Sequence, residues 1–133
     1  SGKELRNLMK DPLWNTVQRQ PSAMVFPNGE SLRAASARAV EAIREIDARF
    51  SDDETWLCAS HGDIIKAIVA DALGTPLDLF QRIAIDPASI TVIRYSGERP
   101  TVVRVNLSAE GAAAGLADKP KRPSLLGRLR GEN

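Results

Sequence analysis

One short segment of the chain combines residue types that could do chemistry. Ser60, His61 and Gly62 follow a mainly apolar run at residues 55–59 and precede an apolar-rich stretch at residues 63–73. This order predicts a buried strand over residues 55–60, a tight turn and the start of a helix. A helix N-terminus carries unpaired N–H groups and a positive dipole end, which favour anions such as phosphate. His61, the only histidine in 133 residues, stands where that anion would bind.

The same residues also have a purely structural explanation. Gly62 lets the backbone turn sharply and lets a ligand approach, but glycine turns between strand and helix are common. Ser60 and His61 are not a nucleophile and base, because neighbours on an extended strand point to opposite faces. One histidine and one cysteine give no set of zinc ligands, and Cys58 is expected to be a buried, inert thiol.

A long amphipathic helix is predicted to follow residue 31. Ser31 or Asn28 can cap its N-terminus. Glu30 is explained as a carboxylate that complements the helix dipole, and Arg38 as a solvated residue on the helix surface. One helix face is apolar, formed by Leu32, Ala35, Ala39, Ile43, Ile46 and Phe50.

The helix after His61 is predicted over residues 63–73, and Gly74 should end it. Asp63 lies in its first turn, and Lys66 either pairs with it or lies near the anion, of which the pair is favoured. Farther on, the sequence predicts a short helix over residues 77–83. Two strands, over residues 89–95 and 101–106, should then form a hairpin. Before residue 18, short amphipathic helices broken near Pro12 are expected.

Composition narrows the function classes but selects none. The chain has 18 basic and 17 acidic residues, 43% hydrophobic residues and a net charge of +1, so it is not a strongly basic nucleic-acid binder. Its length fits one domain over residues 1–108 and a basic, disordered tail over residues 109–133. No apolar run reaches the roughly 18–20 residues that span a bilayer, and a lone cysteine forms no internal disulfide. We therefore expect a cytoplasmic protein without a membrane partner.

Three segments in order resemble the histidine phosphatase (phosphoglycerate mutase-like) superfamily. They are Pro27-Asn28-Gly29-Glu30-Ser31, Ser60-His61-Gly62 and Asp86-Pro87-Ala88-Ser89-Ile90-Thr91-Val92. The resemblance covers roughly residues 1–107 and is greatest to actinobacterial phosphomutases of this superfamily. It implies an α/β fold, a three-layer α/β/α sandwich, in which this chain lacks the N-terminal strands.

The resemblance also assigns roles to residues. His61 would be the second catalytic histidine, and the Gly62 backbone N–H would help to bind phosphate. Glu30 and Arg38 would support the pocket from behind those groups. The family needs no metal or organic cofactor. Glycolytic mutases of the family have asparagine where this chain has Asp63, and a carboxylate there would repel phosphate.

The family's nucleophile is another histidine, in an Arg-His-Gly motif that does not occur in the 133 residues. Also missing are the pocket arginine and the usual acidic residue. The chain is therefore expected to be the distal, inactive part of a phosphatase or phosphomutase that acts on a small phosphate ester through a phosphohistidine. The alternatives are a non-catalytic phosphate-ester binding module and a structural α/β domain. Without its first strands the sheet would have an open edge, so we expect the chain to self-associate.

Overall fold

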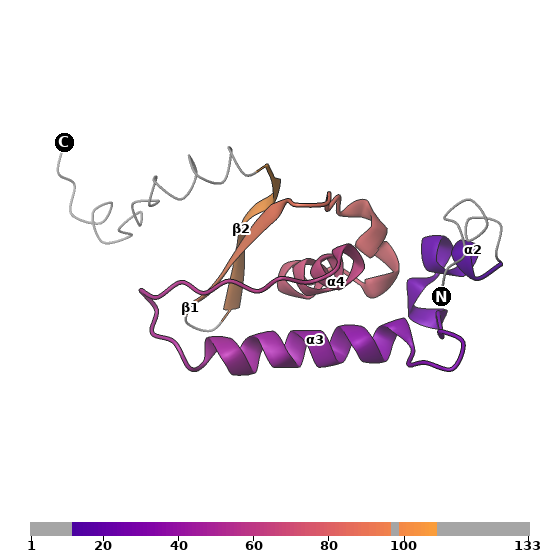
Figure 1. Ribbon diagram of the computed structural model, residues 1–133, viewed down its shortest axis with the longest axis horizontal. Coiled ribbons are helices and arrows are strands. Elements are labelled where there is room, and N and C mark those ends of the chain that lie inside the picture. Colours follow the sequence, from indigo (N-terminus) through magenta and orange to yellow (C-terminus); the bar gives the residue numbers. More distant parts are fainter. Residues whose placement is uncertain (1–11, 97–98, 109–133) are drawn as a thin grey trace, which may run out of the picture.

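The computed structural model describes residues 12–96 and 99–108. The elements, in chain order, are α2 (Pro12–Arg19), the 3-10 helix η1 (Pro21–Ala23), α3 (Leu32–Asp47), α4 (Gly62–Leu73), the 3-10 helix η2 (Leu77–Arg82), β1 (Ile90–Ser96) and β2 (Arg99–Leu107). In Figure 1, α3 runs along one side, α2 lies near its N-terminal end, and α4 and the two strands lie on the same side of α3. Direct contacts join α4 to α3, to η2 and to β2, so α4 is the central element of the described fold.

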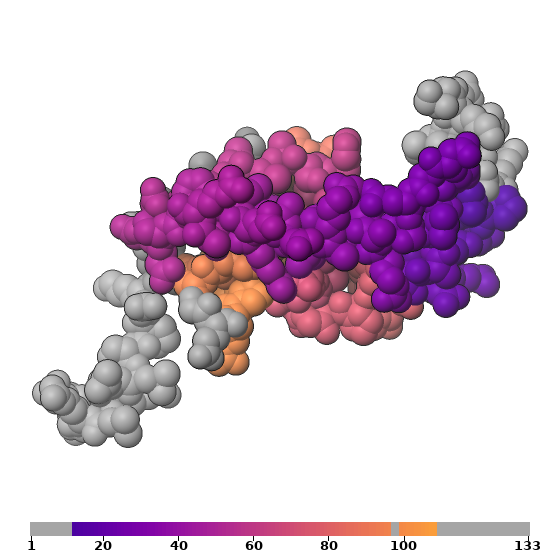
Figure 2. All heavy atoms as spheres, turned by 90° about the horizontal axis from the view of Figure 1, so that it is seen from below, coloured from indigo at the N-terminus to yellow at the C-terminus, as the bar shows by residue number. Residues whose placement is uncertain are grey.

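Helix α3 begins as the sequence predicts. Ser31 has extended backbone angles, and its Oγ accepts a hydrogen bond from the Ala34 N–H at 3.1 Å. This N-cap satisfies one of the open N–H groups of the first turn. Leu32, Ala35 and Ser36 are buried, and the Ser36 hydroxyl donates to the Leu32 carbonyl at 2.7 Å. Figure 2 shows α3 extending along one face of the molecule, with the orange strands beside its C-terminal part.

Helix α4 packs its middle turns into the core. Ala67, Ile68, Val69 and Ala70 are buried. The helix ends at Gly74, whose φ of 68° lies in the left-handed region that glycine adopts without a steric penalty. The predicted helix and its glycine end are therefore confirmed. The main core cluster joins five residues from four segments of the sequence, namely Met24, Leu32, Ala67, Ala70 and Phe80.

The predicted hairpin is confirmed. Strands β1 and β2 pair antiparallel from Ile90 opposite Leu107 to Ser96 opposite Arg99, with register shifts between Ile90 and Ile93. They form the only sheet among the described residues. The short helix predicted over residues 77–83 is also present, as η2.

The buried strand predicted over residues 55–60 is wrong for the described part of the chain. This segment is extended but belongs to no sheet there, and Leu57 is 86% exposed. Cys58 is a free and exposed thiol, not a buried one. A strand is buried only when neighbours take up its N–H and C=O groups and cover its side chains, and the described residues provide no such neighbour. Trp56 is tied down locally, because its Nε1 donates to Asp47 Oδ1 at 2.9 Å and its ring stacks on Phe50.

Of the short helices predicted before residue 18, the structure describes the part from Pro12 onward. Pro12 begins α2, which fits the expected break near this residue and suits proline because the first helical residue needs no N–H partner. The tail over residues 109–133 and the segment over residues 1–11 lie outside the described residues. No described helix is long and apolar enough to cross a membrane.

Candidate functional site

His61 is the N-cap residue of α4. Its backbone is extended, with φ of −87° and ψ of 151°, and its carbonyl accepts the first helical hydrogen bond, from Ile65 N–H at 3.0 Å. Its imidazole makes no capping hydrogen bond, and the residue is exposed. Within the described part of the chain, the side chain is therefore open to a ligand at the helix N-terminus.

The backbone N–H groups of the first turn are open as well. Gly62, Asp63 and Ile64 precede the first residue that donates within the helix, and their N–H groups have no acceptor among the described residues. Together with the positive end of the α4 dipole, such groups form an anion-binding site. The imidazole of His61 adds a donor from the side chain to these donors from the backbone.

The sequence predicts that Gly62 makes a sharp turn, and the structure does not show one there. Gly62 lies in ordinary helical backbone, since Gly74 is the only described glycine with a positive φ. A Cβ at Gly62 would lie 3.8 Å from the Ile85 carbonyl oxygen, which is ordinary contact. Neither the backbone conformation of Gly62 nor its packing among the described residues requires glycine at this position.

The charges beside His61 are balanced. The Lys66 Nζ lies 3.4 Å from Asp63 Oδ1, which confirms the predicted pair. The same ammonium donates to Gln81 Oε1 at 2.9 Å and lies 5.8 Å from the centre of the Phe80 ring. The Lys66 side chain is only 17% exposed, so it is held in place. It offsets the carboxylate charge that would repel a phosphate at this helix end.

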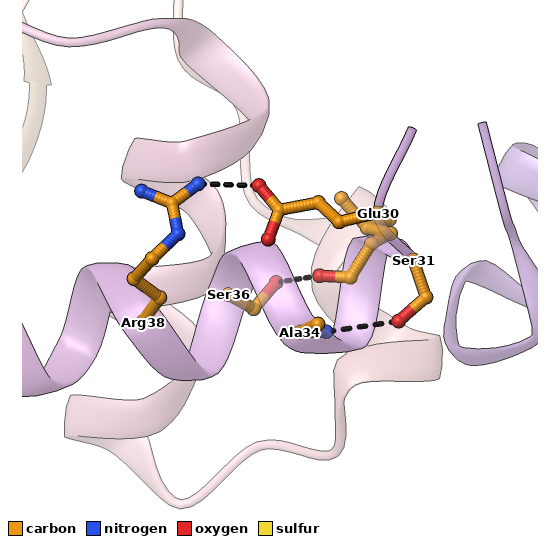
Figure 3. Close-up of polar contacts among 6 residues, drawn as sticks. Glu30, Ser31, Ala34, Ser36 and Arg38 are labelled. Atoms are coloured by element: carbon orange, nitrogen blue, oxygen red, sulfur yellow. Dashed lines mark hydrogen bonds and ion pairs between the residues drawn. The ribbon is translucent and has the colours of Figure 1, made fainter. Parts of the chain in front are cut away.

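Glu30 and Arg38 meet each other. Their side chains point toward one another across the first turns of α3 and form an ion pair (Figure 3). The hydrogen bond with Glu30, and then its charge, raise the pKa of Arg38 above its ordinary value. Both side chains are substantially exposed, at 43% and 70%. Within the described residues no hydrogen bond or ion pair joins them to His61, so their supporting role stays a prediction.

Sequence reasoning missed one residue that lies against this site. Ile85 brings its carbonyl oxygen next to Gly62, from the segment between η2 and β1. A contact between residues 23 positions apart leaves no local pattern by which it could have been found. Among the described residues there is no cluster of three or more metal-ligating side chains.

The helices and the hairpin define an α/β protein, and an exposed histidine lies at the N-terminus of α4. The histidine phosphatase superfamily (branch 1) model matches residues 2–108, and the chain belongs to this superfamily. No curated protein sequence matches the chain.

Several solved structures share the fold. YhfR of Bacillus stearothermophilus is 27% identical with a TM-score of 0.69, and the match covers 82% of this chain and 55% of YhfR. A phosphoserine phosphatase mutant from Entamoeba histolytica, in complex with phosphoserine, is 18% identical with a TM-score of 0.66, covering 80% and 54%. The alpha-ribazole phosphatase from Shigella flexneri is 19% identical with a TM-score of 0.61, covering 78% and 52%. The chain spans about half the length of each of these proteins, and the expected α/β fold class is confirmed.

Proposed function

We propose that this chain supplies one side of the phosphate pocket of a phosphatase or phosphomutase. His61 is its catalytic residue, and the Gly62 N–H binds phosphate beside it. One observation carries the proposal: the Ser60-His61-Gly62 motif places an exposed histidine at the N-cap of α4, directly before three residues whose N–H groups are open. The family match and the phosphatases among the similar structures support it.

The proposed reaction needs a second histidine as nucleophile, because His61 acts as a hydrogen-bond donor. His61 is the only histidine in the 133 residues. That nucleophile would come from polypeptide beyond this chain. Its nitrogen forms a bond to phosphorus as the bond from phosphorus to the ester oxygen breaks, and an acid protonates the leaving alcohol. Water or an acceptor hydroxyl then attacks phosphorus, and the nitrogen–phosphorus bond breaks. His61 and the Gly62 N–H donate to equatorial phosphoryl oxygens and stabilise the charge that spreads there.

The substrate we propose is a small phosphate ester, and hydrolysis is favoured over glycolytic mutase activity. Asp63 stands where those mutases have an asparagine that contacts substrate, and its carboxylate is engaged by Lys66. We also propose a cytoplasmic location, because the free, exposed thiol of Cys58 suits a reducing compartment. We also propose that, within the superfamily, this chain is most similar to actinobacterial phosphomutases.

The test uses the native polypeptide that contains this chain, identified by intact mass and by the coding sequence upstream of Ser1. Its hydrolysis of p-nitrophenyl phosphate is compared with that of a His61→Ala variant. Loss of one transition-state donor should lower kcat by about 100-fold or more. Arg19→Ala, at an exposed position at the end of α2, is the control and should keep full activity. Undiminished turnover by His61→Ala overturns the catalytic role.

A second candidate function is phosphate-ester binding without turnover, and the presence of a single histidine favours it. Under this alternative the native polypeptide also lacks an Arg-His-Gly strand and hydrolyses nothing. Inorganic phosphate would still raise its melting temperature, because a ligand of the folded state alone stabilises that state. Turnover excludes this alternative. No turnover together with no stabilisation by phosphate excludes both functions.

A further inference from the structure

The peptide group between Ile85 and Asp86 faces the start of α4. Its carbonyl oxygen lies 3.8 Å from the position that a Cβ on Gly62 would take, yet it accepts no hydrogen bond from α4. A trans peptide is planar, and its N–H points away from its carbonyl. Whatever holds the Asp86 N–H therefore also sets the direction of the Ile85 carbonyl.

Asn106 holds that N–H. Its Oδ1 accepts a hydrogen bond from Asp86 N–H at 2.7 Å, and its Nδ2 donates to Asp86 Oδ2 at 2.8 Å. The backbone of Asn106 has a φ of 58°, a left-handed conformation that asparagine tolerates better than most residues. One side chain thus fixes both the main chain and the carboxylate of Asp86.

Asn106 is itself anchored to the neighbouring strand. Its backbone N–H donates to Thr91 Oγ1 at 3.3 Å, within the part of the hairpin where the register shifts. Asn106 is half-buried and lies near the end of β2, the strand that also packs against α4. The hairpin therefore provides a fixed support for the peptide group beside the helix N-terminus.

We propose that Asn106 is a positioning residue for the phosphate site at α4, which it serves by holding the Ile85 carbonyl away from the open N–H groups. If it were not held away, the carbonyl oxygen would accept hydrogen bonds from the N–H groups of the first turn. Held beside Gly62 without bonding to it, the carbonyl leaves those donors to a phosphoryl group. The inference rests on the proposed function and adds a residue that the Ser60-His61-Gly62 motif does not contain.

The test variant is Asn106→Gly, because glycine keeps the left-handed backbone and removes only the side chain. Binding of inorganic phosphate is measured by calorimetry on the native polypeptide that contains this chain. Amide hydrogen exchange is followed by mass spectrometry over residues 60–66 and 84–89. In Asn106→Gly the dissociation constant should rise about fivefold, because the carbonyl becomes a competing acceptor. Without phosphate, exchange should become slower over residues 60–66 and faster over residues 84–89.

Two control variants separate positioning from general support of the hairpin. Thr91→Val removes the bond to the Asn106 backbone N–H, and Asp86→Ala removes the carboxylate but keeps the bond from the Asp86 N–H. Both should leave phosphate affinity within about twofold of wild type, since the peptide group stays held. If Thr91→Val and Asn106→Gly lost equal phosphate affinity, Asn106 would only support the hairpin, and the proposal would be overturned.

Failure of the two proposals can be told apart. If wild type binds phosphate and Asn106→Gly binds it equally well, the positioning role is wrong and the phosphate site stands. If wild type binds no phosphate, the proposed function is wrong. Asn106 then positions no phosphate site, and the exchange data decide only whether its side chain holds the Ile85 carbonyl: slower exchange over residues 60–66 in Asn106→Gly, and not in Asp86→Ala, supports that contact, and unchanged exchange overturns it.

Discussion

At the start of α4, the balance between one carboxylate and one ammonium sets how strongly an anion is attracted. Asp63 is 52% exposed and lies beside the open N–H groups, whereas Lys66 is nearly buried against Phe80 and Gln81. The pair is therefore asymmetric. The ammonium is fixed in place, and the carboxylate remains accessible to solvent and to an arriving phosphate.

Replacing Asp63 by asparagine should strengthen phosphate binding. The change removes a negative charge from the anion site and leaves Lys66 in place, so the dissociation constant for inorganic phosphate should fall about two- to fivefold at low salt. Calorimetry at two salt concentrations checks this, and high salt should shrink the gain. Glu41→Gln, at an exposed position of α3, is the matched loss of a carboxylate and should change little. Weaker binding by Asp63→Asn would show that the carboxylate does not face the phosphate.

At the scale of elements, a short polar bridge joins the two 3-10 helices. The backbone N–H of Ser22 in η1 donates to Asp78 Oδ1 at 2.8 Å, and its hydroxyl donates to Asp78 Oδ2 at 2.9 Å. These residues are 56 positions apart, so the bridge fixes the N-terminal part of the fold against η2. The two hydrogen bonds, from the backbone first and then the hydroxyl, hold the pKa of Asp78 below its ordinary value.

This bridge predicts a dependence of stability on pH. Because the folded pKa of Asp78 is depressed, its contribution is complete above the ordinary carboxylate pKa of about 3.9 and is lost as the pH falls through the folded value. Denaturant unfolding from about pH 6 to pH 3 should therefore show a smaller loss of stability in Asp78→Asn than in wild type. Asp52→Asn, in an exposed turn, should keep the wild-type slope. Parallel pH profiles for wild type and Asp78→Asn would refute the linkage.

Elements with their own local signals were predictable from sequence, and those that depend on distant partners were not. The cap at Ser31, the glycine end of α4 and the alternation of β1 and β2 all follow from residues within a few positions. Burial of residues 55–60 depends on neighbouring strands, so an apolar run alone predicted it wrongly. The contact of Ile85 with Gly62 likewise depends on chain segments that meet only in the folded molecule.

At the scale of the whole molecule, apolar side chains remain exposed on the described surface. Leu57 is 86% exposed on an extended segment that belongs to no sheet in the described part of the chain. An open, apolar extended segment is a template for pairing with another chain. Leu73 is 56% exposed, but it lies on α4, where the helix satisfies the backbone.

We therefore predict that the chain associates with itself and that Leu57 drives the association more than Leu73. Leu57→Lys should shift the chain toward monomer, because a lysine on an open strand opposes edge-to-edge pairing. Leu73→Lys makes the same chemical change on a helix and should have a smaller effect. Sedimentation velocity over a range of concentrations measures both. A monomeric wild-type chain with a sharp, cooperative unfolding transition would contradict the prediction.

The measurement that tests the central claim most directly is a phosphate titration observed at His61. Since this is the only histidine in the sequence, its imidazole gives one assignable signal in a histidine-labelled chain. If the N-terminus of α4 binds phosphate beside this side chain, the signal should shift and saturate with added inorganic phosphate, and sulfate should compete. An imidazole signal that stays unchanged through the titration, at constant pH and ionic strength, would contradict a phosphate site at His61.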